Sequence, residues 1–498
     1  MLDFIISQTT AFLSAMPKSK RKKIGQFFTS RETAEYMASM FDFSRAQGEV
    51  WVLDPGAGTG VLTAAIVDRL QGIETVRAIN ITCYETDPEV LPLLKNNLRY
   101  IEERAIVPLN YSVIEEDYLL SQADDFNGVS RESESAPKYD FVIGNPPYLR
   151  VNKDHAAAVS LSEVVHGAPN LYFLFASMSL FNLRGGGEMV YIIPRSWTSG
   201  AYFKAFRTYF LHYGKLTHIH LFVSRDKVFS QEQVLQETII LKAKKTAEIP
   251  KKVLLTSSHS NSDFNSITKI ELPYDSIVAG KDLYVFLPTS REDVRAIQSM
   301  NRYTNTLPDI GFRMKTGIIV DFRNRDLLRG EPGEHVLPLF YSQHIKDGRV
   351  FHLPSGKDFD WVVDSKPGLI QKNKNYVFCK RFTAKEERRR LQCGIYLESD
   401  FSEYDSIGTQ NKINFVDHTN GEPLSLSEVY GLYALFNSSL FDRYYRILNG
   451  STQVNSTEVN NIPVPPVDVI CDIGERLITA NDLSTETCDK ILNEVAYG

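Results

Sequence analysis

Short apolar runs alternate with helix-length amphipathic segments through the first half of the chain. Strands are predicted at 50–53, 79–84, 111–114, 141–143, 188–194, 216–222 and 233–241, and helices at 61–70, 88–104, 170–183 and 201–211. Such alternation is typical of a mostly parallel sheet covered by helices. No helix separates the last two strands, so the final strand should run antiparallel. The pattern predicts an α/β domain with a seven-stranded sheet.

The alternation stops near Thr246, beyond which short strands and loops dominate. We therefore divide the chain into an N-terminal helix with a basic linker (1–24), an α/β domain (25–245) and a mixed α+β domain with C-terminal helices (246–498). Ser425 and Glu428 form a capping-box pattern, and a terminal helix is expected over 474–496. Residues 121–138 indicate a surface insertion and 149–169 a mobile lid.

A glycine-rich turn follows the first strand. Its sequence, Asp54-Pro55-Gly56-Ala57-Gly58-Thr59-Gly60, lets the backbone turn tightly and approach a ligand closely. Glu85 ends the second strand, where an acidic side chain commonly binds ribose hydroxyls. Asp117 follows the third strand, where an acceptor would meet an adenine amino group. Together these residues predict a ligand that contains a nucleoside.

Four residues of unusual chemistry follow the fourth strand: Asn145, Pro146, Pro147 and Tyr148. The amide oxygen of Asn145 and the carbonyl of Pro146 are two acceptors, and the second proline stiffens the backbone beside them. Tyr148 adds an aromatic face. This combination suits an exocyclic amino group on a planar system, which leaves adenine N6, cytosine N4 and an amide NH2 open. A strand that simply ends in a diproline turn is the plainer alternative.

Composition restricts the class of protein. The 498 residues are 43% hydrophobic and 23% charged, which is typical of a globular protein with a large core. No apolar run is long enough to span a membrane and the start lacks a signal peptide, so we expect a cytoplasmic protein. The five cysteines are scattered without metal-ligand spacing, so neither a disulfide framework nor a metal site is predicted.

The formal net charge is −6, yet basic residues are clustered in places. The lysines and arginine of 18–23 form either a solvated linker or a phosphate contact. In the C-terminal half, basic side chains interleave with aromatic ones, and we predict that they bind DNA phosphates, with some arginines contacting guanine edges. The predicted DNA-binding residues are Lys315, Arg323, Lys380, Arg381, Arg388, Arg389 and Arg390.

From Gly25 to Leu241 the motifs resemble, in kind and order, the gamma-class, TaqI-like N6-adenine DNA methyltransferases of restriction-modification systems. The resemblance implies a class I S-adenosylmethionine-dependent methyltransferase fold followed by a target-recognition domain. It implies cofactor binding by Thr29, Asp54, Gly56, Gly58, Gly60, Glu85 and Asp117, catalysis by Asn145, Pro146, Pro147 and Tyr148, and stacking of the flipped target base on Tyr148 and Phe229. Ser30 departs from the family, which more often has proline there, and this affects the expected shape of the loop over the cofactor.

The implied reaction is transfer of a methyl group from S-adenosyl-L-methionine to N6 of an adenine flipped out of double-stranded DNA. The implied partners are duplex DNA and a cognate restriction endonuclease that forms no stable complex with the chain. Methylation of cytosine N4, of RNA adenine or of a protein glutamine are the alternative reactions. A catalytically inactive DNA-binding specificity protein is the alternative of another class, and measuring cofactor binding would distinguish it.

Overall fold

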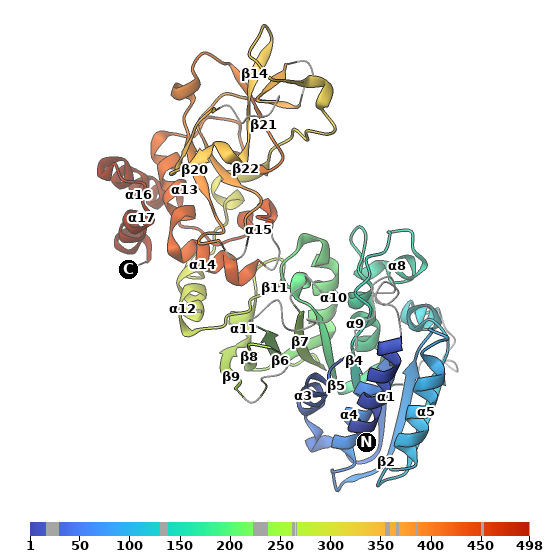
Figure 1. Cartoon of the computed structure of the whole chain (residues 1–498). Coiled ribbons are helices and arrows are strands. Elements are labelled where there is room, and N and C mark those ends of the chain that lie inside the picture. Colours follow the sequence, from blue (N-terminus) through green and yellow to red (C-terminus); the bar gives the residue numbers. More distant parts are fainter. Residues whose placement is uncertain are drawn as a thin grey trace. The chain divides into compact units, whose positions relative to one another are not determined.

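The computed structural model describes residues 1–15, 29–129, 138–222, 238–260, 264, 266–353, 359–364, 368–384, 387–449 and 453–497. The basic linker and Phe229 lie outside these ranges. The chain forms two units, Met1–Thr289 and Ser290–Gly498, each with its own core (Figure 1). The predicted boundary at 245/246 is therefore wrong, because two further strands beyond it belong to the sheet of the first unit.

The first unit is built on one large mixed sheet. Its strands are β1 (Gly48–Pro55), β2 (Val76–Tyr84), β3 (Leu109–Ile114), β4 (Tyr139–Gly144), β5 (Leu183–Pro194), β6 (Gly214–Phe222), β7 (Thr238–Lys245), β8 (Lys252–Ser258) and β9 (Thr268–Pro273). Among the described residues they lie in the order β3-β2-β1-β4-β5-β7-β6-β8-β9, and β7 is antiparallel to both of its neighbours. This confirms the class I methyltransferase sheet. The extra strands extend it, because β8 pairs with the edge of β6 and β9 pairs with β8.

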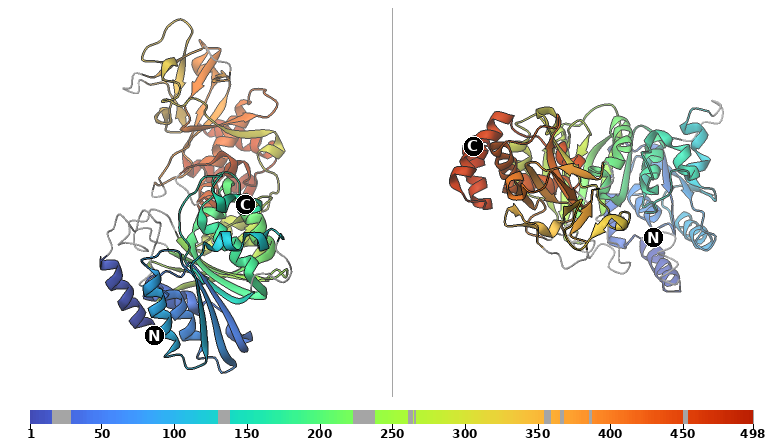
Figure 2. Two further views of the ribbon diagram at one scale, coloured as in Figure 1. Left: turned by 90° about the vertical axis from the view of Figure 1, so that its right-hand side faces the viewer. Right: turned by 90° about the horizontal axis from the view of Figure 1, so that it is seen from above.

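The helices of this unit cover the two faces of the sheet. They are α1 (Leu2–Ala15), α3 (Arg31–Ser39), α4 (Val61–Leu70), α5 (Leu91–Glu102), α6 (Tyr118–Ser121), α7 (Ala123–Phe126), α8 (Ala156–Ser160), α9 (Leu171–Asn182), α10 (Lys204–Tyr213) and α11 (Tyr274–Ile277), with the short hairpin β10 (Val278–Ala279) and β11 (Tyr284–Val285). Alternate residues of β5 show the two faces: Val190 and Ile192 join the core under α3 and α4, whereas the Tyr191 hydroxyl bonds to Ser179 of α9. Figure 2 shows α1, in dark blue, on the outer side of the helices that cover the sheet, where it packs against α4 and α3.

Two local predictions in this unit change. The strand predicted at 188–194 begins earlier, at Leu183, so that Gly185, Gly186 and Gly187 lie inside β5. The expected lid over 149–169 contains α8 and a 3-10 turn at Ser162–Val164. Ser30 caps α3, because its hydroxyl accepts a hydrogen bond from the Thr33 amide at 3.3 Å.

The second unit combines two sheets and a helical layer. Its strands are β12 (Phe312–Thr316), β13 (Leu328–Arg329), β14 (Val336–Phe340), β15 (Ile345–Lys346), β16 (Arg349–Val350), β17 (Trp361–Val363), β18 (Ile370–Lys372), β19 (Tyr376–Lys380), β20 (Cys393–Tyr396), β21 (Ser406–Thr409) and β22 (Ile413–His418). In the part of the chain that the structure describes, one sheet has the order β12-β22-β19-β20-β16-β15 and the other β13-β17-β14-β21-β18.

The helices of the second unit are α12 (Arg291–Met300), α13 (Leu426–Asn437), α14 (Ser439–Leu448), α15 (Ser456–Asn460), α16 (Val467–Ala480) and α17 (Thr485–Leu492). The capping box at Ser425 and Glu428 is confirmed. Gly431 and Gly474 let α13 and α16 pack very closely, since a Cβ on either would overlap the backbone of the facing helix. The predicted terminal helix is two helices, because Asn481 takes a left-handed conformation with φ of 47°. No helix in the described ranges is long and apolar enough to cross a bilayer.

Candidate active site

The glycine-rich turn joins β1 to α4 at the carboxyl end of the sheet. Gly56, Gly58 and Gly60 have backbone φ angles of 138°, 54° and 85°, which residues with a Cβ atom rarely adopt. The Ala57 amide donates to the Tyr84 carbonyl at 2.9 Å, which fixes the turn against the end of β2. This geometry is the reason for glycine at these three positions.

Glu85 is anchored by backbone amides on both carboxylate oxygens. Its Oε2 accepts from the Gly58 amide at 3.0 Å, and its Oε1 accepts from Thr86 and Asp87 at 2.8 Å each. Burial raises the pKa of this carboxyl, while the backbone hydrogen bonds act in the opposite direction. The carboxylate is thereby held in place beside the glycine turn.

A cavity of about 600 Å³ opens beside these residues. Seven of the predicted site residues line it: Thr29, Gly56, Gly58, Glu85, Asp117, Asn145 and Pro147. Glu85 and Asp117 offer acceptors for hydroxyl and amino groups, and Leu62 and Phe175 add apolar surface. Such a mixed lining fits a nucleoside that carries an amino-acid tail. Asp117 also caps α6, since its Oδ1 accepts from Leu119 at 2.9 Å and from Leu120 at 3.0 Å.

Asp54, Gly60, Pro146 and Tyr148 are not among the lining residues. Asp54 is fully buried beneath the turn, and its Oδ2 accepts from the Thr63 hydroxyl at 2.8 Å. Burial, followed by the nearby charge of Glu85, raises the pKa of Asp54 to about 7. The predicted direct contact of Asp54 with the cofactor is therefore replaced by a role in shaping the turn. Gly60 precedes the first residue of α4.

The Asn145–Tyr148 segment begins directly after β4. The Asn145 amide nitrogen donates to the Thr29 hydroxyl at 3.1 Å, so Asn145 lies between the cavity and the α3 side of the unit. The Tyr148 hydroxyl lies 3.0 Å from Asn145 Oδ1 and 2.9 Å from the Ile192 carbonyl, and both are acceptors. Burial raises the pKa of Tyr148, so its hydroxyl keeps the proton that it donates.

Sequence reasoning missed several residues of the site. Tyr118, His155, Leu171 and Phe175 line the cavity from α6, the start of α8 and α9. His155 Nδ1 accepts from the Ala157 amide at 3.3 Å and so caps α8. Only the position of Tyr118 directly after Asp117 was a usable signal. The others reach the cavity through the packing of helices that are distant in the sequence.

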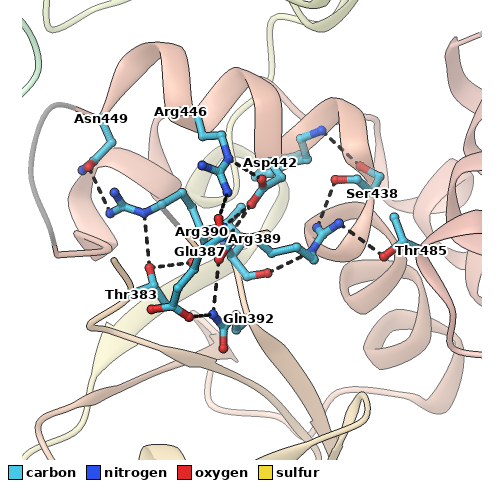
Figure 3. A network of polar contacts seen from close by, with 12 residues as sticks. Thr383, Glu387, Arg389, Arg390, Gln392, Ser438, Asp442, Arg446, Asn449 and Thr485 are labelled. Atoms are coloured by element: carbon cyan, nitrogen blue, oxygen red, sulfur yellow. Dashed lines mark hydrogen bonds and ion pairs between the residues drawn. The ribbon is translucent and has the colours of Figure 1, made fainter. Parts of the chain in front are cut away.

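Arg390 lies inside the second unit and not on its surface. Arg390 is 1% exposed, and its guanidinium donates to Thr383 at 3.2 Å and to Asn449 at 3.3 Å (Figure 3). Burial lowers the pKa of Arg390. A guanidinium enclosed in this way cannot reach a DNA phosphate, so the predicted contact is wrong.

Arg389 also belongs to this internal network. Its guanidinium donates to the carbonyls of Phe436 and Ser438 at 3.0 and 3.1 Å, and to the Thr485 hydroxyl at 3.3 Å (Figure 3). These bonds join the segment before β20 to α13 and α17. Arg389 therefore holds helices of its own unit together, which replaces its predicted role at DNA.

The remaining predicted basic residues differ in exposure. Arg323 and Arg388 are exposed, and Arg388 lies 3.8 Å from Glu486. Lys315 pairs with Asp417 at 2.9 Å across β12 and β22. Lys380 and Arg381 are half-buried, and Arg381 donates to the Asn411 carbonyl at 3.0 Å. All five keep surface that a polyanion can reach.

Comparison with known proteins supports one family. Residues 75–229 match the model of the Eco57I restriction-modification methylase family. The chain is 33% identical to the type II methyltransferase M.PstI of Providencia stuartii over 97% of its own length and 94% of that protein. It is 31% identical to M.BsuBI of Bacillus subtilis over 94% of its length and 92% of that protein.

The structure resembles the type IIL restriction-modification enzyme MmeI, solved in complex with DNA, with a TM-score of 0.55 and 12% identity over 98% of this chain and 78% of that one. At this identity the likeness concerns the fold. Together, the fold and the relatives indicate S-adenosylmethionine as the methyl donor, and the lining of the cavity fits it. The chain belongs to the type II methyltransferases of restriction-modification systems.

Proposed function

We propose that this type II methyltransferase transfers a methyl group from S-adenosylmethionine to N6 of adenine at a specific site in duplex DNA. The observation that supports this most strongly is that Asn145 lines the same cavity as Gly58 and Glu85. A methyl donor held by the glycine turn would therefore lie beside the acceptors of the Asn145–Tyr148 segment. Protection of host DNA from a cognate endonuclease is the corresponding role.

Asn145 and Pro146 supply the chemistry that such an amine needs. The lone pair of adenine N6 is delocalised into the ring, so the nitrogen is a poor nucleophile. Asn145 Oδ1, which faces the Tyr148 hydroxyl, is the proposed acceptor for one N6 proton, and the Pro146 carbonyl is the other proposed acceptor. Hydrogen bonds to both N6 protons favour tetrahedral nitrogen and its developing positive charge. The methylated amine then loses a proton without a dedicated base.

Reaching N6 requires the base to leave the helix, which costs a few kcal/mol. Stacking on an aromatic ring contributes about 1–3 kcal/mol per base. Tyr148 is the proposed platform on one side. Phe229, outside the described residues, is proposed for the other side from the family motif.

The second unit supplies the proposed DNA-binding surface. Three segments meet there, since the Asn411 amide donates to Ile319 at 2.8 Å and the Arg381 amide donates to Lys412 at 2.9 Å. The exposed aromatics Phe322 and Phe382 lie on these segments, at 79% and 45% exposure. Basic side chains interleaved with exposed rings suit phosphate contacts and insertion at base steps. We propose Lys315, Arg323, Lys380, Arg381 and Arg388 as contacts, together with Lys412.

The test is to incubate the purified protein with mixed-sequence duplex DNA and methyl-labelled S-adenosylmethionine, and to digest the DNA to nucleosides. We expect the label in N6-methyldeoxyadenosine. Label in N4-methyldeoxycytidine would contradict the base assignment. Label in RNA or in a co-incubated protein fraction, with none in DNA, would contradict the proposed substrate class.

A further inference from the structure

The N-terminal helix α1 contacts the back of the glycine turn. The hydroxyl oxygens of Thr9 and Thr59 lie 2.7 Å apart, and these residues are 4% and 2% exposed. The Thr9 hydroxyl also donates to the Ile5 carbonyl at 2.8 Å, within the helix. Because a hydroxyl has one proton, Thr59 must be the donor to Thr9. The turn therefore ends in a directed hydrogen-bond chain that leads into α1.

Helix α1 is anchored independently of this bond. Ile5 is fully buried in the core shared with α4, and the Phe4 ring stacks on Tyr100 of α5 with centroids 3.8 Å apart. Arg31 at the start of α3 pairs with Asp3 at 2.7 Å. Thr9 is thus presented to the turn from a fixed support.

Thr59 is also held through its backbone, since the Asn97 side-chain amide of α5 donates to the Thr59 carbonyl at 2.8 Å. Thr59, which stands between Gly58 and Gly60 in the turn, lines the cavity. Glycines have the largest conformational freedom to lose, so a turn rich in them needs external contacts to keep one shape.

We propose that Thr9 is a positioning residue that holds the glycine turn in its cofactor-binding conformation, which makes α1 part of the cofactor site. The inference rests on the proposed use of this cavity for S-adenosylmethionine. It adds a contact from a helix that the sequence pattern assigns to a separate N-terminal segment.

The test compares Thr9→Val with Thr10→Val in the full chain. Thr10 is the matched control, because its hydroxyl makes the same bond to a carbonyl four residues earlier, Ile6, on the exposed side of α1. We expect Thr9→Val to weaken S-adenosylmethionine binding, measured calorimetrically without DNA, by about tenfold. The KM for S-adenosylmethionine should rise while kcat at saturation changes less than about twofold. Thr10→Val should bind like the unmodified protein, and Thr9→Ser should restore affinity.

A double-mutant cycle with Thr59→Val isolates the bond, and Thr9→Ala reports on it if Thr9→Val fails to fold. Non-additive losses of affinity support the proposal. Unchanged affinity in the foldable single variant, or additive losses, would overturn it. Absence of S-adenosylmethionine binding by the unmodified protein would overturn both the cofactor assignment and this inference, whereas equal binding by Thr9→Val overturns only the latter.

Discussion

The amide of Asn145 is oriented from both sides. Its nitrogen donates to Thr29 and its oxygen faces the hydroxyl of Tyr148, so the acceptor is fixed before a base arrives. Thr29 lines the cavity as well, so one side chain links the Asn145–Tyr148 segment to the proposed cofactor site. Such preorganisation lets a hydrogen bond act mainly in the transition state.

Removing the amide should therefore affect catalysis much more than cofactor binding. We expect Asn145→Ala to lower kcat at least 10²- to 10³-fold and to leave S-adenosylmethionine affinity within about threefold. Tyr148→Phe keeps the aromatic ring and loses only the hydroxyl, so its kcat should fall by only about tenfold. Single-turnover methylation and calorimetry measure the two quantities. A large loss of S-adenosylmethionine affinity in Asn145→Ala would contradict this assignment.

Asp54 makes stability depend on pH. In the folded state the pKa of Asp54 is about 7, above the ordinary value of 3.8. Between these two pH values the folded protein therefore keeps a proton on Asp54 that the unfolded chain has released. The stabilising contribution is full below about pH 4 and is lost as the pH rises through 7.

Asn at this position stays neutral and can still accept from Thr63. Asp54→Asn should gain stability relative to the unmodified protein by roughly 1 to 4 kcal/mol between pH 5 and pH 8. Urea denaturation across this range measures the difference. Parallel stability profiles for the two proteins would show that Asp54 does not titrate as described.

At the scale of elements, local patterns predicted the catalytic sheet well. The apolar runs and the absence of a helix before the final strand were sufficient to predict the seven strands and the antiparallel direction of the last one. The extra pairing of β8 with β6 was not predictable, because it depends on an edge that exists only in the folded sheet. Asn481 breaks the terminal helix through a single left-handed residue, which periodicity does not reveal.

The basic run at 388–390 shows most clearly what the sequence pattern alone does not predict. Three consecutive arginines indicate a solvated or phosphate-binding surface, yet Arg390 bonds to Thr383 and Asn449 inside the unit. Asn449, which directly follows α14, is 59 residues away in the sequence. Only the tertiary fold brings them together, so charge clustering alone gave the wrong role.

Adjacent arginines should consequently behave differently. Arg390→Ala should lower the free energy of unfolding by about 2–4 kcal/mol, because it empties a buried polar network and leaves its partners unpaired. Arg388→Ala, at an 89% exposed side chain, should change it by less than about 0.5 kcal/mol. Urea unfolding of both variants provides the comparison. Equal stabilities, combined with equal losses of DNA affinity, would restore the surface interpretation.

At the scale of the whole molecule, one unit holds the proposed cofactor cavity and the other holds the proposed DNA-binding surface. The formal charge of −6 does not prevent DNA binding, since basic side chains gather locally at 323, 380–381 and 412. This separation predicts that DNA affinity can be altered without changing the chemistry.

Lys380→Ala and Lys412→Ala should each weaken DNA binding for all sequences alike. Each should also flatten the plot of log affinity against log salt by about 0.9, as expected for one lost phosphate contact. Lys490→Ala, exposed on α17, serves as the control and should leave the slope unchanged. Fluorescence anisotropy at several salt concentrations gives these slopes. Identical slopes for all three variants would exclude this surface.

The central claim is that the Asn145–Tyr148 segment methylates adenine N6 at a specific DNA sequence. Modification-aware sequencing of DNA from cells that express the chain, or its Asn145→Ala variant, tests this most directly. We predict N6-methyladenine at one recurring sequence with the unmodified protein and none with the variant. Methylated cytosine at that sequence, or adenine methylation that persists in Asn145→Ala, would contradict it.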